Sequence, residues 1–138
     1  MRRLTLIALI LILIIPCLNA QKKEIAQARS YIKGRNNYDK AEQLMEDQLK
    51  KPENRQNKKL YQIDFEAIRH QYDEQNEKLY LKQNYDTAAL FKAAYRMFSV
   101  LERFDSVDAS PDKKGNIKPK YRKKHADFLD SYRMNLYY

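Results

Sequence analysis

The chain has 138 residues, with 27 Lys or Arg against 18 Asp or Glu and a net charge of +9 at pH 7. Its two glycines and single cysteine exclude a glycine-rich phosphate-binding loop and a disulfide framework. β-Branched residues are few after the first 20 positions, so strands have little to build on and we expect an all-α fold.

Residues 1–20 have the pattern of a secretory signal peptide. Two arginines precede a run over residues 4–15 that is apolar except for Thr5, and the following stretch ends in the polar Asn19 and the small Ala20. As a helix this run would span about 18 Å, against about 30 Å for the hydrocarbon core of a bilayer. We expect cleavage after Ala20 and a protein exported to the periplasm or envelope. Two alternatives stay open: an uncleaved membrane anchor, and a lipoprotein acylated at Cys17.

Residues 21–138 form the second predicted unit, a single small helical domain. They carry 25 basic and 18 acidic side chains and no cysteine, because the first 20 residues hold two arginines and Cys17. Thiol catalysis and Cys-ligated zinc are therefore excluded in the processed chain. Its stability has to come from the packing of helices.

The first two predicted helices cover residues 22–33 and 38–50, separated by a short turn over residues 35–37. Gly34 stands where a helix stop is expected, and Pro52 follows the second helix. Apolar residues recur at helical spacing in both segments. They are Ile25, Ala28 and Ile32 in the first helix, and Ala41, Leu44, Met45 and Leu49 in the second.

A third predicted helix begins near residue 57 and has a wide apolar face made of two adjacent stripes. One stripe holds Leu60, Ile63 and Ala67, and the other holds Tyr61, Phe65, Ile68 and Tyr72. The pattern leaves open whether this helix continues to residue 82 or breaks at the polar residues 73–76. A fourth helix is predicted over residues 86–105. Its apolar stripe consists of Leu90, Ala94, Met97, Leu101 and Phe104, with Phe91 and Phe98 beside it.

Residues 106–118 have the composition of a loop, with Pro111 and Gly115 as helix breakers. A last helix is predicted from Pro119, which suits a first helical position, to about residue 133. Its apolar face would include His125, Phe128, Leu129 and Tyr132.

The sequence Tyr-Asp-Lys-Ala at residues 38–41 recurs 47 positions later as Tyr-Asp-Thr-Ala at residues 85–88. Each copy resembles the start of the second helix of a tetratricopeptide repeat (TPR), where a tyrosine precedes a small residue. The signature residues would be Tyr38, Ala41, Tyr85 and Ala88. In this resemblance the alanines let the two helices of a hairpin approach closely.

More broadly, the processed chain resembles the N-terminal part of exported TPR proteins of Gram-negative bacteria. Residues 21–26 and 111–115 carry this second likeness. The resemblance implies antiparallel helical hairpins in a right-handed array that binds a protein or peptide in its groove. It departs from the family in its period, since 47 exceeds the usual length of about 34, and the usual tryptophan and glycine of the first helix are missing.

The resemblance also implies further repeats beyond Tyr138 and a polar last unit. The final residues Leu136, Tyr137 and Tyr138 are apolar or aromatic. We therefore expect either a short, incomplete array or a homo-oligomer that forms through this end.

A basic segment, residues 113–124, is the second notable feature of the chain. Its seven cations are Lys113, Lys114, Lys118, Lys120, Arg122, Lys123 and Lys124. An alternative function follows from it, namely binding to an anionic membrane surface or to lipopolysaccharide phosphate. The competing explanation is a solvated loop and helix start. Nucleic acid is not an expected partner, because Tyr121 is the only aromatic residue in the segment.

Catalytic and metal sites are not expected. His70 and His125 are isolated from each other in the sequence, and Asp105, Asp108 and Asp112 lack the spacing of a calcium-binding loop. We expect no enzyme activity and no cofactor. The predicted function is an exported TPR-like scaffold for protein or peptide binding, and most of the eleven tyrosines are expected to serve packing.

Overall fold

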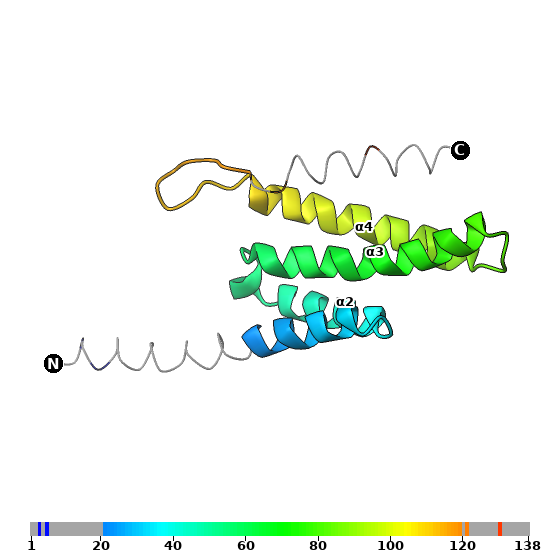
Figure 1. Ribbon diagram of the computed structural model, residues 1–138. Coiled ribbons are helices and arrows are strands. Elements are labelled where there is room, and N and C mark those ends of the chain that lie inside the picture. Colours follow the sequence, from blue (N-terminus) through cyan, green and yellow to red (C-terminus); the bar gives the residue numbers. More distant parts are fainter. Residues whose placement is uncertain (1–2, 4, 6–20, 120, 122–129, 131–138) are drawn as a thin grey trace.

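The computed structural model describes residues 3, 5, 21–119, 121 and 130, and its regular elements are all helical. Residues 21–33 form the first helix of the described chain. It is followed by α2 (Tyr38–Leu49), the 3-10 helix η1 (Pro52–Asn54), α3 (Lys58–Tyr80) and α4 (Thr87–Asp108). Successive α-helices run in alternating directions (Figure 1). The predicted all-α fold is confirmed, and the described residues contain no strand.

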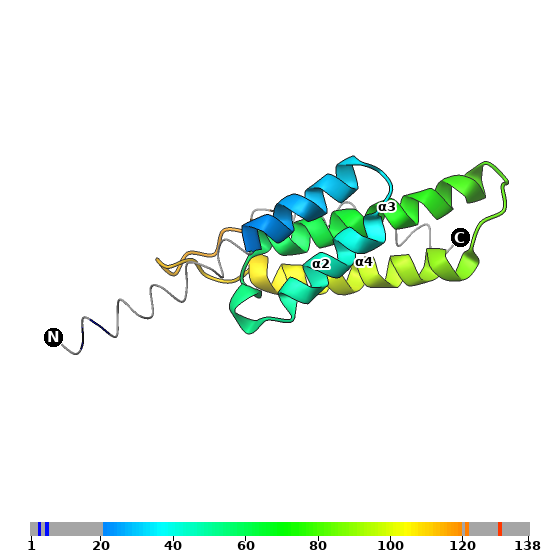
Figure 2. The same ribbon diagram turned by 90° about the horizontal axis from the view of Figure 1, so that it is seen from below.

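α3 is the central helix, in contact with α2 on one side and α4 on the other. Seen from below, the hairpin of residues 21–33 and α2 lies across the half where α3 begins and α4 ends (Figure 2). α3 has 23 residues and α2 has 12, so their lengths are about 35 and about 18 Å. The far end of the α3–α4 hairpin therefore extends beyond α2 (Figure 1).

One apolar core joins all four helices. The inner stripe of α4, predicted from its spacing, is buried at every position from Leu90 to Phe104. Small side chains lie where helices meet, and Ala28, Ala41 and Ala67 are fully buried. Alanine at such positions lets helix axes approach closely. The largest core residues that are almost completely buried are Met45, Leu60, Ile68, Met97 and Val100.

α3 is continuous through residues 73–76, which settles the alternative left open by the sequence. The polar residues there are held by local contacts rather than breaking the helix. Arg69 pairs with Asp73 at 3.5 Å, one turn away, and Gln75 accepts a hydrogen bond from the backbone N–H of Asp86 at 2.9 Å. Tyr72, immediately before this stretch, is buried.

α4 extends to Asp108, so the loop predicted to start at residue 106 starts at residue 109 instead. Composition was misleading here because Asp108, although charged, is 1% exposed. Its carboxylate accepts hydrogen bonds from Lys58 Nζ at 3.1 Å and from the Tyr121 backbone N–H at 3.0 Å. Of the predicted last helix the structure describes Pro119, Tyr121 and Asp130, of which Pro119 and Tyr121 are not helical and Asp130 is. Of the predicted signal peptide it describes residues 3 and 5.

The first helix ends at residue 33, as the sequence predicts, yet the residue in the left-handed conformation is Arg35 (φ 56°) rather than Gly34. The Gly34 and Arg35 N–H groups donate to Ser30 and Ile32 carbonyls at 2.9 and 3.1 Å. The turn is therefore hydrogen-bonded, but it places a residue with a Cβ where glycine is favoured.

Replacing Arg35 with glycine is expected to raise the free energy of unfolding by about 1 kcal/mol, because it removes the left-handed strain of a side-chain-bearing residue. Urea denaturation followed by circular dichroism would measure it. Arg29, exposed in the same helix, provides the matched control, and Arg29→Gly should lower stability by about 1 kcal/mol. Equal losses from both substitutions would contradict the strain at Arg35.

Candidate functional site

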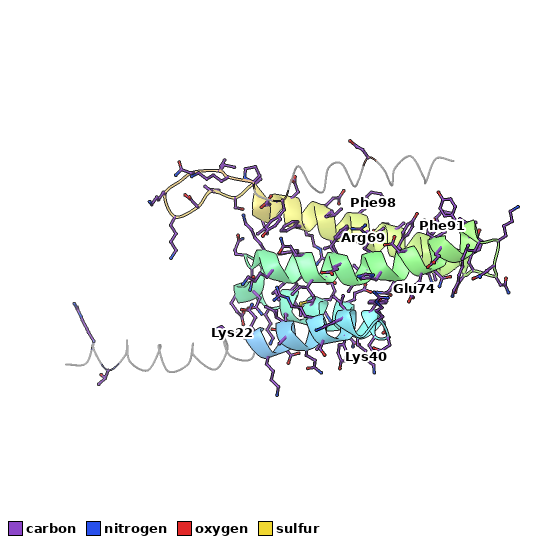
Figure 3. All side chains as sticks on the ribbon, viewed as in Figure 1. Lys22, Lys40, Arg69, Glu74, Phe91 and Phe98 are labelled. Atoms are coloured by element: carbon purple, nitrogen blue, oxygen red, sulfur yellow. The ribbon has the colours of Figure 1, made fainter. Side chains whose placement is uncertain are left out.

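The side of α4 that faces away from α3 carries exposed aromatic residues. Phe91 is 55% exposed and Tyr95 is 75% exposed, and Figure 3 shows Phe91 and Phe98 on this same side. These three residues, the outer face of α4, follow the inner stripe by one position and so lie about 100° around the helix. An open depression of about 400 Å³ is formed here by Phe91, Lys92, Tyr95 and Arg96.

A second depression, a polar cleft of about 380 Å³, lies between α3 and α4. It is lined by Gln71, Glu74, Gln75, Asp86, Ala88, Ala89, Lys92, Ala93 and Arg96. The three alanines of α4 leave room between the helices because they present only a methyl group. Lys92 and Arg96 line both depressions, so an apolar and a polar surface meet along these two cations.

Asp86 lines the cleft and caps α4. Its carboxylate accepts a hydrogen bond from the Ala89 N–H at 2.9 Å, while its own N–H donates to Gln75 Oε1 at 2.9 Å. A capping carboxylate satisfies an otherwise free N–H of the first turn and suits the positive end of the helix dipole. The start of α4 is thereby fixed against α3.

Arg96 is held by side chains from two other helices. Its Nε donates to Glu42 Oε1 of α2 at 2.7 Å, and its Nη2 donates to Gln71 Oε1 of α3 at 3.2 Å. Gln71 Nε2 also donates to Glu42 Oε2 at 2.6 Å. The Glu42 side chain is 14% exposed and that of Arg96 is 38% exposed. The network therefore fixes the guanidinium at the edge of the cleft while leaving part of it open to solvent.

A second charged group links the same three helices further along. Arg103 of α4 donates to Glu46 of α2 at 2.5 and 3.3 Å, and its Nη2 lies 3.9 Å from Oδ2 of Asp64 in α3. Asp64 is 0% exposed, and within the described residues no N–H or O–H group donates a hydrogen bond to its ionised carboxylate. An ionised carboxylate in this position would be costly.

The state of Asp64 follows from its surroundings. Burial, together with a hydrogen bond to Glu46 and the charge of that residue, raises the pKa of Asp64 to about 10. Two ionised carboxylates only accept, whereas a protonated Asp64 donates to Glu46. For Glu46, burial acts to raise the pKa, but the hydrogen bonds from Asp64 and Arg103 outweigh it and lower the pKa. The pair therefore holds one proton, with the charge on Glu46.

The four residues of the predicted repeat signature occupy different environments. Tyr38 is the first residue of α2, is buried, and stacks on His70 with ring centroids 4.6 Å apart. Tyr85 precedes the α4 N-cap and packs against the core while partly exposed. Ala41 is fully buried, whereas Ala88 is exposed at the cleft. The two motif copies thus differ in their position relative to the helix start.

The described part of the basic segment lies at the opposite end of the described structure from the α3–α4 turn. Lys113, Lys114 and Lys118 are exposed on the loop after α4, and Figure 1 shows that loop at the end away from residues 81–86. The remaining predicted cations, Lys120, Arg122, Lys123 and Lys124, lie outside the described residues. The described part of this segment does not contribute to the cleft, and lipid binding through it stays a prediction.

Sequence reasoning missed the cleft residues Gln71, Gln75, Lys92 and Arg96. Their only signal was indirect, in the aromatic residues that flank the inner stripe of α4. Among the described residues, His70 lies 4.0 Å from Glu66, and no group of three or more potential ligands is placed to hold a metal ion.

Crossing a bilayer requires a long apolar helix, and none of the helices in the described part of the chain has that length and character. Two charged networks join α2, α3 and α4, and Phe91 and Tyr95 stay exposed on the outer face of α4. Comparison with protein-family models, with curated proteins and with solved structures gave no match.

Proposed function

We propose that this chain is an exported helical scaffold that binds a protein or peptide segment on the outer face of α4 and in the adjoining cleft. The proposal rests on one observation. The exposed Phe91 and Tyr95 line the same depression as Arg96, whose guanidinium is held by Glu42. In this proposal the protein acts by binding, without catalysis and without a cofactor.

The chemistry of the two depressions defines the ligand. Phe91 and Tyr95 offer large contact areas with few rotatable bonds, which suits an apolar or aromatic side chain of the ligand. Lys92 and Arg96 lie beside them and suit a carboxylate, with Arg96 already oriented by Glu42 and Gln71. The expected ligand is a polypeptide segment in which an apolar residue lies within a few positions of Asp or Glu.

The helical hairpins support a TPR-like reading of the scaffold as part of the same proposal. Successive α-helices alternate in direction (Figure 1), and Ala28 and Ala41 are fully buried in the first hairpin. The recurrence of Tyr-Asp-x-Ala adds to this support. In a right-handed array the outer face of α4 would belong to the surface available to a partner or to a following hairpin.

Selection from a random peptide library displayed on phage tests the binding proposal. Immobilised protein is expected to enrich peptides that pair an apolar residue with an acidic one. The double variant Phe91→Ser/Tyr95→Ser should lose this enrichment, because it removes the aromatic contacts while leaving the buried stripe intact. A control variant, Lys113→Gln/Lys114→Gln, changes exposed cations at the other end and should select the same peptides. Equal enrichment by the Phe91/Tyr95 variant would contradict the proposed site.

A further inference from the structure

The turn that joins α3 to α4 exposes three consecutive apolar residues. Leu79, Tyr80 and Leu81 are 41%, 74% and 58% exposed. Consecutive residues at a helix end point about 100° apart, so all three can be exposed only where the helix has no neighbour on most sides. The α3–α4 hairpin provides this because it extends beyond α2 (Figure 1). We refer to residues 78–82 as the tip.

The backbone of the tip is held in a defined conformation. The Gln83 N–H donates to the Lys78 carbonyl at 2.8 Å, and the Lys82 N–H donates to the Leu79 carbonyl at 3.1 Å. Lys82 has φ 55°, as expected for the left-handed residue of a Schellman helix end. The apolar residues are thus presented by a structured helix terminus instead of a loose loop.

We propose that the tip inserts into the interfacial region of a phospholipid bilayer. A fluid lipid interface can surround the protruding tip, so it can contact side chains that point in three directions. A stable interface with a second copy uses about 20–30 residues a side, and the apolar part of the tip offers three. Leu and Tyr suit the boundary between hydrocarbon and headgroups, while the stems of Lys78 and Lys82 allow their ammonium groups to reach lipid phosphate.

The charges around the tip indicate that apolar insertion, rather than electrostatic attraction, drives the proposed binding. Lys78 and Lys82 are offset by Glu77 and Asp86 in the same stretch of sequence. Binding driven by apolar insertion depends weakly on ionic strength, whereas binding through the basic loop would weaken steeply as salt screens it. Because the tip and the basic loop lie at opposite ends (Figure 1), a local probe can separate the two surfaces.

The chain contains no tryptophan, so a single introduced tryptophan reports on one place. In the full chain, Tyr80→Trp is expected to shift its fluorescence to the blue when phosphatidylcholine/phosphatidylglycerol vesicles are added, and to be quenched by lipid carrying a doxyl group. The shift should persist at high salt. Leu79→Ser/Leu81→Ser in this background should weaken the vesicle response at least about tenfold, because two apolar insertions are lost.

The control is Ile117→Trp, which places the probe at a residue that is 62% exposed on the loop after α4. Its emission should stay unchanged with vesicles at high salt, because salt screens any binding through the basic loop. Because the probe position is local, attachment through residues 1–20 would not produce the Tyr80→Trp signal. Three results would overturn the proposal: no response of Tyr80→Trp to vesicles, a response of Ile117→Trp alone, or a Tyr80→Trp shift that rises with protein concentration in the absence of lipid. The last would assign the tip to self-association.

Discussion

Replacing Asp64 with asparagine is expected to stabilise the protein at neutral and alkaline pH and to flatten the dependence of its stability on pH. Asp64 is completely buried, and its pKa is raised from 3.8 to about 10. The unfolded chain loses this proton near pH 4, while the folded chain keeps it until about pH 10. Between these values the unfolded state binds fewer protons, so stability falls as pH rises.

An asparagine amide can donate a hydrogen bond to Glu46 and does not ionise. The substitution therefore removes the loss of folding free energy that comes from keeping Asp64 protonated at neutral and alkaline pH. We expect a gain on the order of 1–3 kcal/mol at pH 8, the usual penalty for a poorly satisfied buried polar group. The contribution of Glu46 to stability depends on pH in the opposite direction, because its pKa is lowered from 4.5. Its contribution is present above pH 4.5 and is lost as pH falls through the lowered value. Acid should therefore destabilise both proteins.

Urea denaturation at pH 5, 7 and 9 would measure these effects. The matched control is Asp47→Asn, which changes a half-exposed carboxylate paired with Lys50 at 2.7 Å and should leave the pH dependence as in the natural protein. A lower stability of Asp64→Asn at pH 9, or a natural protein that gains stability from pH 5 to pH 9, would show that Asp64 is ionised and paired with Arg103.

Replacing Met97 with alanine is expected to cost about 2–5 kcal/mol of unfolding free energy, the range for large-to-alanine substitutions that leave a core cavity. Met97 is 1% exposed in the middle of the inner stripe of α4. Thermal melting followed by circular dichroism would show the loss as a lower midpoint. Tyr95→Ala, two residues earlier and 75% exposed, should change stability by about 0.5 kcal/mol or less. Similar losses at both positions would contradict the assignment of inner and outer faces.

Helical periodicity predicted the helices and their buried faces, because each helix buries a stripe whose spacing is set within the helix itself. The stripe from Leu90 to Phe104 needs no knowledge of its neighbours, and all five of its predicted residues are buried. The end of α4 was not predictable in this way. Asp108 continues the helix because Lys58, 50 residues earlier, meets its carboxylate at 3.1 Å, and no local pattern contains that contact.

The candidate site depends even more on relations between helices. Arg96 is positioned by Glu42 and Gln71, which lie 54 and 25 residues away in the sequence. From the sequence alone each of these is an ordinary polar residue on a helix surface. The repeated Tyr-Asp-x-Ala motif shows the same limit, because Ala41 is buried and Ala88 is exposed although their local sequences match. Neighbouring helices, rather than the motif, decide burial.

The measurement that tests the central claim most directly is mapping of a selected peptide onto the protein by nuclear magnetic resonance. The peptide would come from the library selection, and backbone amide shifts would be followed during its titration into ¹⁵N-labelled protein. The account predicts that the largest changes fall on residues 89–96 of α4 and around Gln71 and Gln75 of α3. Changes confined to α2, or to the loop around Lys113 and Lys114, would contradict it.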